Sequence, residues 1–453
     1  MSASTGAAPP IQGLVAVVGA GPAGLYAAQV LAARGADVAL LNRDVKPGGL
    51  AEYGIFPTKH KMKEGLRKQF RSILDSERIS YFGHVTVGDK GNLTLDELRE
   101  YCDAVLVTVG AQGTKWLGLP GEDLRGVYHA KDLVYHYNQL PPFATRTYDI
   151  GRRVAVVGVG NVALDIARWL VRMRHVDEVA LVARRGPAEV KFDKSEMESV
   201  ARNLDVAALD SELARVQPVM QSLAQDPVAA RAFILSALPK ALEPVSATRV
   251  RLEFLASPAR ILGESGRVTG LEVDDTTLVQ GESGVETRHT GRQRIIACDT
   301  VVFAVGDSVD PAVGLKVYRS GFATSSTPRF PVNDASFEAL DGKTGALLPD
   351  VFLAGWARVP SAGLVGTARK DGNAGANAVL QWLAASPGTH AGGKAALQAR
   401  LERNAAPLVD RRLWRALEDV EKAEAQTRQL EEFKFSTDDE MLQAMGWTPG
   451  GAR

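Results

Sequence analysis

The sequence predicts an α/β fold with two Rossmann-like dinucleotide-binding domains, one inserted within the other, and a helical segment at the C-terminal end. The main observation is a pattern that occurs twice: an apolar strand, a glycine-rich turn, a helix and a second strand. Each copy is followed further along the chain by a closing strand of similar sequence. The 45% hydrophobic and 23% charged residues are typical of a globular protein, which agrees with this fold.

The first copy begins with a predicted strand at Leu14–Val18, and the sequence GAGPAG follows at Gly19–Gly24. A helix is expected over Leu25–Arg34 and a second strand over Ala36–Leu41. The closing strand is DAVLVTVG at Asp103–Gly110. Glycines at this spacing permit a tight turn and let backbone N–H groups approach a pyrophosphate at a helix N-terminus. The strand before and the helix after the turn are the context that makes the motif specific.

The second copy begins with a predicted strand at Arg153–Val157, followed by GVGNVA at Gly158–Ala163. A helix is expected over Leu164–Arg172 and a second strand over Glu178–Ala183. The closing strand is DTVVFAVGD at Asp299–Asp307. Alanine replaces the third glycine here, a variant that the dinucleotide-binding fingerprint tolerates.

A third strand of the same kind, DVFLAGW at Asp350–Trp356, should return the chain to the first domain, which is why we predict an insertion. Ahead of it, Ser195–Leu242 has helical spacing, and Thr248–Thr290 alternates like a small antiparallel sheet. Ala395–Trp447 is helical and highly charged. Because its heptad pattern is not sustained, we expect a docked pair of terminal helices rather than a coiled coil.

The composition excludes several classes of protein. The chain of 453 residues has 53 Lys+Arg and 53 Asp+Glu, so bulk attraction to nucleic acid is not expected. Cys102 and Cys298 lie far apart and no CxxC occurs, which excludes a disulfide scaffold, a cysteine-ligated metal site and a dithiol redox site. No metal site is predicted. Any redox chemistry must therefore use a bound cofactor.

The apolar run Leu14–Ala33 is not expected to be a signal peptide or a membrane span. Glycine and proline residues interrupt it, and residues 1–13 contain no Lys or Arg. We expect a cytoplasmic protein that contacts neither membrane nor nucleic acid.

The residues after the second strand of each copy bear on the nucleotide. Asn42 stands where an acidic residue would bind a ribose, and Asp44 is close enough in sequence to compensate. Arg184 and Arg185 suit the 2′-phosphate of NADP, whereas an acid there would suit the ribose hydroxyl of NAD. We expect NADP and leave NAD open. The alternative is that both arginines are simply solvated at a strand end.

These motifs resemble a known family. GVGNVALDIAR at Gly158–Arg168 is similar to the NADP-binding signature of adrenodoxin reductase and related bacterial ferredoxin–NADP reductases. The resemblance extends to RRGP at Arg184–Pro187, to LGLPGEDLRGV at Leu117–Val127, and to AGW followed by Gly363. The stretch Gly48–Pro57 is also similar to the small subunit of glutamate synthase and to FAD subunits that supply iron–sulfur partners.

The resemblance implies FAD in the first domain and a nicotinamide dinucleotide in the second. The boundaries that follow are 1–114 and 318–394 for the two parts of the FAD domain. The NAD(P) domain, with its helical and small β insertion, takes 115–317, and the C-terminal helical segment takes 395–453.

The resemblance also implies which positions contact each cofactor. Those implied for FAD are Gly19, Gly21, Pro22, Ala23, Gly24, Asn42, Gly49, Leu50, Val85, Gly110, Gly355, Trp356, Gly363, Leu364 and Val365. Those implied for the nicotinamide nucleotide are Gly158, Gly160, Asn161, Val162, Arg184, Arg185 and Glu196. Two have ordinary alternatives: Glu196 fits a helix capping box with Asp193, and Trp356 fits a core aromatic residue. No catalytic side chain is assigned, because the cofactor carries the chemistry.

The implied function is electron transfer between NAD(P)H and a one-electron iron–sulfur protein such as ferredoxin, with hydride passing to or from flavin N5. The direction is open. One alternative is the FAD subunit of a larger 2-oxoacid or aldehyde oxidoreductase complex that reduces NAD(P). Others are an NAD(P)H-dependent reductase of a small organic substrate, and an assembly protein with a structural flavin.

A run of basic residues is the predicted docking place for the iron–sulfur partner. It consists of Lys59, Lys61, Lys63, Arg67, Lys68 and Arg71, with Glu64 as the one acid among them. In a neutral protein such an asymmetry attracts an acidic partner. The alternative is an ordinary solvated helix face.

Overall fold

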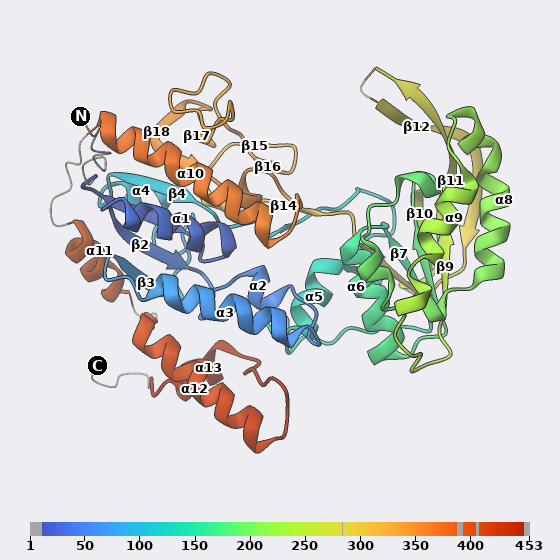
Figure 1. The fold of residues 1–453 in the computed structure, drawn as a ribbon, viewed down its shortest axis with the longest axis horizontal. Coiled ribbons are helices and arrows are strands. Elements are labelled where there is room, and N and C mark those ends of the chain that lie inside the picture. Colours follow the sequence, from blue (N-terminus) through green and yellow to red (C-terminus); the bar gives the residue numbers. More distant parts are fainter. Residues whose placement is uncertain (1–10, 283, 387–392, 405–406, 448–453) are drawn as a thin grey trace, which may run out of the picture. The chain divides into compact units, whose positions relative to one another are not determined.

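The computed structural model describes residues 11–282, 284–386, 393–404 and 407–447 (Figure 1). These residues form two compact units. Unit 1 takes in the described residues of Met1–Gly113, Tyr135–Thr145 and Gly306–Arg453, and unit 2 takes in Thr114–Val134 and those of Arg146–Val305. Compared with the expected domain limits, 135–145 and 306–317 belong to unit 1, as does the C-terminal segment. Residues 405–406 and 448–453 of that segment lie outside the described residues.

Unit 1 is built on a six-stranded sheet. Its strands, in spatial order, are β17 (Glu338–Leu340), β18 (Leu347–Leu353), β4 (Ala104–Val107), β1 (Leu14–Val18), β2 (Asp37–Asn42) and β3 (Ile79–Gly83). All neighbours are parallel except β17 and β18. Every residue of β1 is buried, as expected for a central strand that is covered on both faces. Val15 of β1 pairs with Val38 on one side and Ala104 on the other.

Two long helices lie side by side in unit 1 (Figure 1). They are α1 (Pro22–Ala33) and α10 (Val365–Ala385). Gly372 permits the close approach, because a Cβ there would lie 2.2 Å from the carbonyl oxygen of Ala23. The other helices of this unit are α2 (Leu50–Tyr53), α3 (His60–Leu74), α4 (Leu95–Arg99), α11 (Gly393–Glu402), α12 (Arg411–Thr427) and α13 (Asp438–Ala444).

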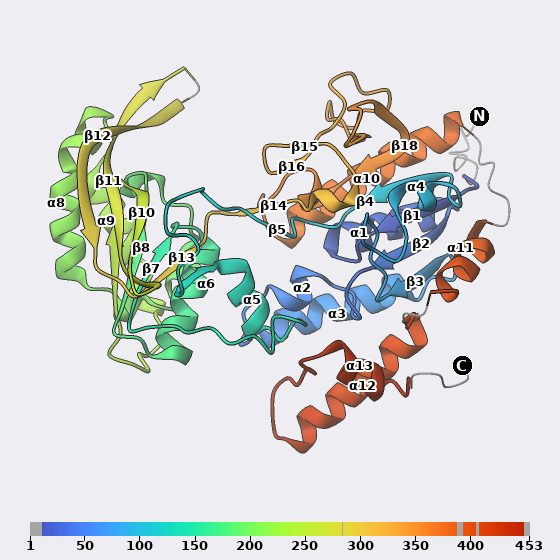
Figure 2. The same cartoon turned by 180° about the vertical axis from the view of Figure 1, so that it is seen from behind.

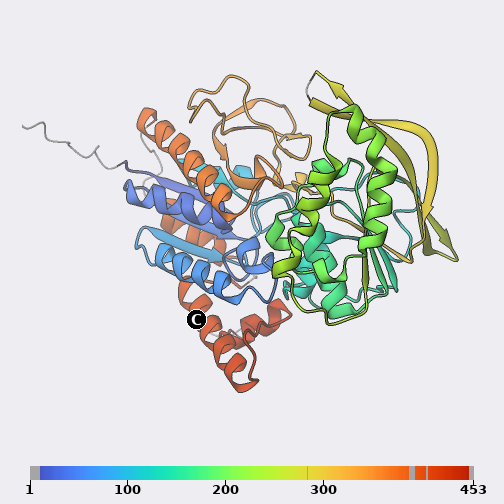
Figure 3. The same cartoon turned by 45° about the vertical axis from the view of Figure 1, so that its right-hand side comes forward.

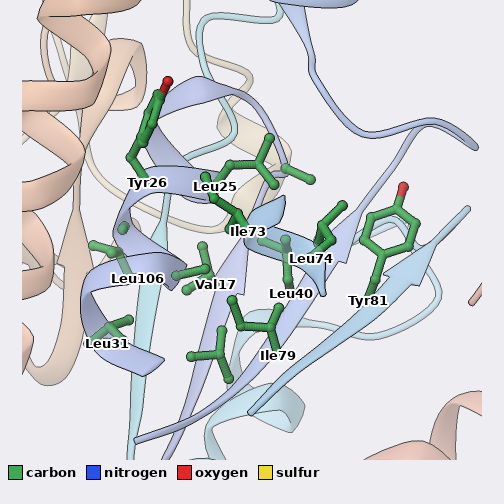
Figure 4. Close-up of a cluster of buried hydrophobic side chains, with 14 of the residues drawn as sticks. Val17, Leu25, Tyr26, Leu31, Leu40, Ile73, Leu74, Ile79, Tyr81 and Leu106 are labelled. Atoms are coloured by element: carbon green, nitrogen blue, oxygen red, sulfur yellow. The ribbon is translucent and has the colours of Figure 1, made fainter. Parts of the chain in front are cut away.

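The core of unit 1 joins the sheet to the C-terminal helices. Figure 4 shows Leu25 and Leu31 of α1 with Ile73 and Leu74 of α3 packed over the strands. Trp414 of α12 belongs to the same buried cluster, which also takes in residues of α13. Figure 2 shows α12 and α13 lying together. A docked helix pair, rather than a coiled coil, is what the structure contains.

Unit 2 is built on a five-stranded parallel sheet. Its strands, in spatial order, are β6 (Val127–His129), β13 (Thr300–Phe303), β7 (Arg153–Val157), β8 (Glu178–Val182) and β9 (Arg249–Glu253). The sequence placed β9 in the small antiparallel sheet, but it pairs in parallel with β8. Sequence alternation does not distinguish an edge strand of one sheet from a strand of another. The antiparallel sheet consists of β10 (Ala256–Glu264), β11 (Arg267–Gly281) and β12 (Gly284–Ile296).

Unit 2 also contains the helices α6 to α9, which lie between its strands in the sequence. Helix α6 (Asn161–Trp169) follows β7 and continues as a π-helical turn, Leu170–Arg174. The predicted helical excursion contains α7 (Lys194–Met197), α8 (Val206–Ser222) and α9 (Pro227–Leu235). Figure 3 shows the two long green helices, α8 and α9, beside the strands of this unit.

The remaining elements are short. They are α5 (Ala130–Tyr137) and the strands β5 (Gly113–Thr114), β14 (Asp307–Ser308), β15 (Val317–Tyr318) and β16 (Gly321–Phe322). Among the described residues, no helix has both the length and the apolar character that crossing a membrane requires.

Candidate cofactor sites

The first glycine turn in unit 1 has two tight positions and one open position. A Cβ on Gly19 would lie 2.6 Å from the carbonyl oxygen of Thr108, and a Cβ on Gly24 would lie 1.9 Å from that of Gly19. These glycines let the strands and α1 approach each other. A Cβ on Gly21 would meet no atom within 4 Å. Gly21 is also the N-cap of α1 and makes no side-chain cap, so the first N–H groups of the helix, which begin at Ala23 because Pro22 has none, face a space suited to an anion.

A second glycine pair lies against this turn. The N–H of Gly48 donates to the carbonyl oxygen of Ala20 at 2.7 Å. A Cβ on Gly49 would lie 3.0 Å from Cα of Gly21, so only glycine fits this closely beside the open position. Leu50 then begins α2. The structure therefore brings Gly49 and Leu50 next to the GAGPAG turn, from which they are distant in the sequence. We call Lys46–Gly49 the glycine-pair loop.

The side-chain amide of Asn42 makes its hydrogen bonds within the protein. Its Oδ1 accepts the N–H of Ala20 at 3.0 Å, and its Nδ2 donates to the carbonyl oxygens of Asp44 and Lys46 at 2.8 and 2.9 Å. The side chain is buried. Both amide hydrogens are used, so Asn42 ties the GAGPAG turn to the loop after β2 instead of offering a donor to a ribose. Arg43 and Asp44, which pair with each other, are the more accessible polar groups here.

Val85 and Gly110 lie at the ends of neighbouring segments of unit 1. Val85 follows β3, its side chain is buried, and its N–H donates to the carbonyl oxygen of Asn42 at 2.9 Å. Gly110 follows β4 with φ of +72°, a conformation that favours glycine. Both shape the surface near the turn through their backbone.

The third part of the unit 1 site comes from the region after β18. A Cβ on Gly355 would lie 2.7 Å from that of Ala23, which places Gly355 beside the start of α1. Nε1 of Trp356 donates to the carbonyl oxygen of Ala362 at 3.0 Å, which closes the loop that leads to Gly363. Leu364 is the N-cap of α10 and is 69% exposed, although it is apolar. Exposed apolar surface of this kind, ahead of Val365 at the helix start, suits a planar aromatic ligand.

Two residues of this site went unrecognised in the sequence. Asp371 accepts the N–H of Gly355 at 2.6 Å and also pairs with Arg358, so it fixes the Gly355 turn. The hydroxyl of Thr108 donates to the carbonyl oxygen of Gly19 at 2.8 Å. Both act through the backbone of distant segments, so no local motif identifies them.

The glycine turn of unit 2 repeats the arrangement of unit 1. A Cβ on Gly158 would lie 2.4 Å from the carbonyl oxygen of Ala304, whereas one on Gly160 would meet nothing within 4 Å. Gly160 is the N-cap of α6 and makes no side-chain cap. Asn161 is held by Asp193: its Nδ2 donates to the carboxylate at 2.7 Å, and its Oδ1 accepts the N–H of Asp193 at 2.8 Å. Val162, the next residue, is 45% exposed.

The arginine pair follows β8 in a firmly held loop. The carbonyl oxygen of Arg184 accepts the hydroxyl of Thr276 at 2.8 Å, and that of Arg185 accepts the N–H of Leu255 at 3.1 Å. The Arg184 side chain is exposed. Nε of Arg185 is buried and makes no hydrogen bond within the described chain. A buried donor without an acceptor is unfavourable, so a ligand oxygen is the fitting partner.

Glu196 does not form the capping box that the sequence allowed. The side chain of Asp193 accepts no capping hydrogen bond at the start of α7, because it is occupied by Asn161. That alternative is therefore wrong.

The basic run on α3 divides into two groups, and part of the predicted docking surface is wrong. Lys63 is buried and pairs with Glu432 at 3.1 Å, and Arg67 pairs with Glu52 through two bonds of 2.7 and 2.6 Å. These two cations are occupied inside unit 1 and are not a free surface. Lys61 and Lys68 are exposed, and Lys59 is half-buried.

Lys63 and Arg67 belong to a larger set, which we call the buried charge cluster. Its members are Lys46, Glu52, Lys63, Arg67, Glu421, Glu432 and Lys434. Burial disfavours the charged form of Lys46, but the carboxylates of Glu421 and Glu52 outweigh burial and raise its pKa to about 12. Burial likewise disfavours the Glu432 carboxylate, but the surrounding cations outweigh it and lower its pKa to about 2. Lys46 and Glu432 therefore remain ionised at neutral pH, whereas burial raises the pKa of Glu421 above its ordinary value.

The two cysteines are buried and free. Burial raises the pKa of each thiol to about 12, so neither forms a thiolate near neutral pH. Neither is suited to thiol redox chemistry.

Known proteins match this chain over most of its length. The family model of the pyridine nucleotide-disulphide oxidoreductases matches residues 14–206. The NADPH-ferredoxin reductase FprA of Mycobacterium leprae is 30% identical over 83% of this chain and 85% of its own length. The chain belongs to the adrenodoxin reductase-like family of ferredoxin–NADP reductases.

Further members of the family agree with this assignment. The human mitochondrial NADPH:adrenodoxin oxidoreductase is 28% identical over 95% of this chain and 92% of its own length. The structure of Mycobacterium tuberculosis FprA in complex with NADPH is 25% identical, has a TM-score of 0.80, and covers 96% of this chain and 100% of that chain. The expected ferredoxin–NADP reductase family, its α/β fold and its enzyme class are confirmed.

Proposed function

We propose that this chain is an FAD-dependent reductase that transfers electrons between NADP(H) and a one-electron iron–sulfur protein. The observation that carries this proposal is the repeated glycine turn. In each unit an uncapped helix N-terminus stands beside one glycine, Gly21 or Gly160, whose Cβ direction is open. Two pyrophosphate sites in one chain fit two dinucleotides.

FAD is proposed to bind unit 1. The N–H groups at the start of α1 receive the pyrophosphate, Gly49 and Leu50 flank it, and Asp44 is available to the ribose. Trp356 and Gly363–Val365 supply the apolar surface for the ring system. When bound, FAD supplies the exchange between two-electron hydride transfer and one-electron transfer. The residues of this chain orient it and exclude water, and no side chain of the site is assigned proton transfer.

NADP(H) is proposed to bind unit 2. The start of α6 receives the pyrophosphate, with Asn161 fixed by Asp193 at its edge. Arg184 and Arg185 receive the 2′-phosphate, which supplies the acceptor that Nε of Arg185 lacks. Glu196 is kept as a proposed contact of the nicotinamide dinucleotide. NAD lacks the 2′-phosphate and is expected to bind more weakly.

The partner is proposed to be an acidic iron–sulfur protein such as ferredoxin, docking on α3. Lys61, Gly65 and Lys68 follow helical spacing and are exposed, so they form one stripe, with Met62 beside it at 57% exposure. Cations around an exposed apolar residue suit a transient complex with an acidic protein. Lys59 extends this surface, whereas Lys63 and Arg67 are excluded from it.

The decisive experiment is an anaerobic absorbance titration of the FAD-loaded protein. NADPH should bleach the flavin band, NADH should do so only at higher concentration, and added oxidised ferredoxin should restore the band. Bleaching without recovery would indicate that the electron acceptor is not ferredoxin but another partner, such as a dedicated iron–sulfur subunit. A protein that retains no flavin after reconstitution would overturn the proposal.

A further inference from the structure

The buried charge cluster joins two distant parts of the chain. Lys46, Glu52, Lys63 and Arg67 come from the segment between β2 and the end of α3. Glu421, Glu432 and Lys434 come from α12 and from the stretch between α12 and α13. All seven belong to unit 1. Six of the side chains are at most 15% exposed, and Arg67 is 21% exposed.

Each charge from the C-terminal side contacts a charge from the N-terminal side. Glu421 pairs with Lys46. Glu432 pairs with Arg67 and, at 3.1 Å, with Lys63. Lys434 pairs with Glu52 at 3.0 Å, and its ammonium also donates to the carbonyl oxygen of Glu52 at 2.9 Å. The contacts reach backbone as well as side chains.

These contacts lie on both sides of the glycine-pair loop. Lys46 begins the loop, and its carbonyl oxygen accepts a hydrogen bond from Asn42. Glu52 follows the loop in α2, and its Cβ would be 3.0 Å from a Cβ on Gly48. Gly48 and Gly49 between them touch Ala20 and Gly21. Glu421 and Lys434 thus hold the two ends of the segment that lies against the open position of the first glycine turn.

The cluster is not needed to attach the C-terminal segment. Trp414, Leu417, Met441 and Leu442 already bury their side chains in the core of unit 1. Desolvating an ion costs several kcal/mol, and apolar residues of similar volume commonly stabilise a protein as well as a buried ion pair does. Directional ion pairs and hydrogen bonds fix a position more narrowly than apolar contact. Their placement around one loop indicates a role in the geometry of that loop.

We propose that Glu421, Glu432 and Lys434 are positioning residues for the flavin. Acting through Lys46 and Glu52, they hold Gly48 and Gly49 at the distance from Gly21 that the FAD pyrophosphate requires. The C-terminal segment thereby becomes part of the FAD site without touching the cofactor. This inference rests on the proposed function, since the loop matters in this way only if FAD binds unit 1.

The test compares two substitutions on the same helix of the full chain. Glu421→Gln removes the charge that pairs with Lys46. Glu418→Gln is the matched control, because Glu418 is one turn away on α12 and pairs with Arg71, outside the cluster. Apoprotein of each variant is reconstituted with FAD, and the dissociation constant is measured by quenching of flavin fluorescence. Thermal unfolding of the apoprotein and the visible absorption and circular dichroism of the bound flavin are recorded beside it.

For Glu421→Gln we expect the FAD dissociation constant to rise at least about tenfold, because an ordered loop becomes less preorganised. The flavin bands should change in the same variant, while the apoprotein midpoint should fall by less than about 3 °C. Glu418→Gln should leave both the affinity and the spectrum unchanged. Equal FAD affinity and identical spectra in the two variants would overturn the inference. So would a loss of affinity that merely follows a large drop in the apoprotein midpoint.

A second variant covers the case in which Glu421→Gln does not fold. Lys46→Met combined with Glu421→Met removes both charges and keeps the buried volume. We expect folded protein with weakened FAD binding and altered flavin bands. Unchanged binding in this variant would overturn the inference. If the unsubstituted chain itself binds no FAD, the proposed function fails, which is a distinguishable outcome.

Discussion

Glu421 of α12 and Lys46 of the glycine-pair loop form a buried ion pair, with side chains 6% and 4% exposed. The two residues are 375 positions apart in the sequence. Unlike an isolated surface salt bridge, this pair is part of a larger network. Lys46 also lies 3.4 Å from Glu52, which in turn binds Arg67 and Lys434. Such a network is cooperative, so changing one member affects the others.

The first prediction concerns the acid sensitivity of this network. The folded-state pKa of Glu432, about 2, lies below its ordinary value of 4.5. Its contribution to stability is therefore present above about pH 4.5 and is lost as the pH falls toward 2, up to about 3 kcal/mol. Glu432→Gln should be less stable than the unsubstituted apoprotein at pH 7, and the difference should shrink between pH 4.5 and 2. Urea unfolding across this range measures it.

Glu424→Gln serves as the control for that series, because Glu424 lies on α12 in an exposed pair with Arg428. Its stability should stay within about 0.5 kcal/mol of the parent at each pH. A Glu432→Gln variant that keeps the same deficit at every pH would contradict the assignment of the acid transition to Glu432.

The ion pairs of the buried charge cluster could not be predicted from the sequence. Lys63 and Arg67 look like part of a basic surface because their partners Glu432 and Glu52 are not visible as partners in a local window. Asn42 is similar: its position at the end of β2 is that of a ribose ligand, but its amide is used by backbone groups on two segments, the first glycine turn and the loop after β2. Long-range pairing decides both cases, and a single sequence carries no signal for it.

The repeated strand, turn and helix pattern was predictable because its signals are local. Glycine is required at positions 19, 24 and 158 because a Cβ there would clash with a backbone carbonyl oxygen. The alternation of apolar strands with helices predicts the parallel sheets. Asp371 and Thr108, which hold the backbone around the candidate FAD site, carry no such signal, because their hydrogen-bond partners lie in segments that only the fold brings close.

The second prediction separates the folding role of the first glycine turn from its binding role. Gly24→Ala should prevent stable folding of unit 1 at a cost above about 3 kcal/mol, since its Cβ would lie 1.9 Å from the carbonyl oxygen of Gly19. Gly21→Ala should fold normally, because its Cβ meets nothing and its φ of −76° suits alanine. It should nevertheless reduce FAD affinity about 100-fold by filling the pyrophosphate space. Circular dichroism and FAD titration of both apoproteins distinguish the two roles. If Gly21→Ala binds FAD tightly, the pyrophosphate does not lie beside Gly21.

The third prediction concerns nucleotide preference. Arg184→Ala and Arg185→Ala should each raise the KM for NADPH about 10- to 100-fold, because a charge-assisted hydrogen bond contributes about 1.5–3 kcal/mol. The KM for NADH should change little, since NADH has no 2′-phosphate. Steady-state dye reduction with both nucleotides measures the effect.

Arg231→Ala is the control for the arginine series, because Arg231 is an exposed residue of unit 2 that pairs only on the surface with Asp210. It should leave both KM values unchanged. If the arginine variants weaken NADPH and NADH equally, the two side chains contribute to folding or to general binding rather than to recognition of the 2′-phosphate.

The fourth prediction concerns the docking surface on α3. Charge reversal of the exposed pair, Lys61→Glu with Lys68→Glu, should lower kcat/KM for ferredoxin about tenfold at low ionic strength, since like charges slow encounter. The difference should shrink at high salt, where exposed charges are screened. NADPH-to-dye activity should not change, because neither lysine belongs to a cofactor site. Lys90→Glu, an exposed lysine in the loop between β3 and α4, is the control.

Lys63→Met distinguishes the exposed lysines from the buried one. Burial and the neighbouring Lys434 lower the pKa of Lys63 to about 8, and its side chain is 1% exposed, so a soluble partner does not meet its charge. The salt dependence of ferredoxin reduction should therefore match that of the unsubstituted protein. If instead Lys63→Met reproduces the kinetics of the charge-reversed pair while that pair behaves normally, the docking surface lies elsewhere, and the basic run acts through the buried charge cluster alone.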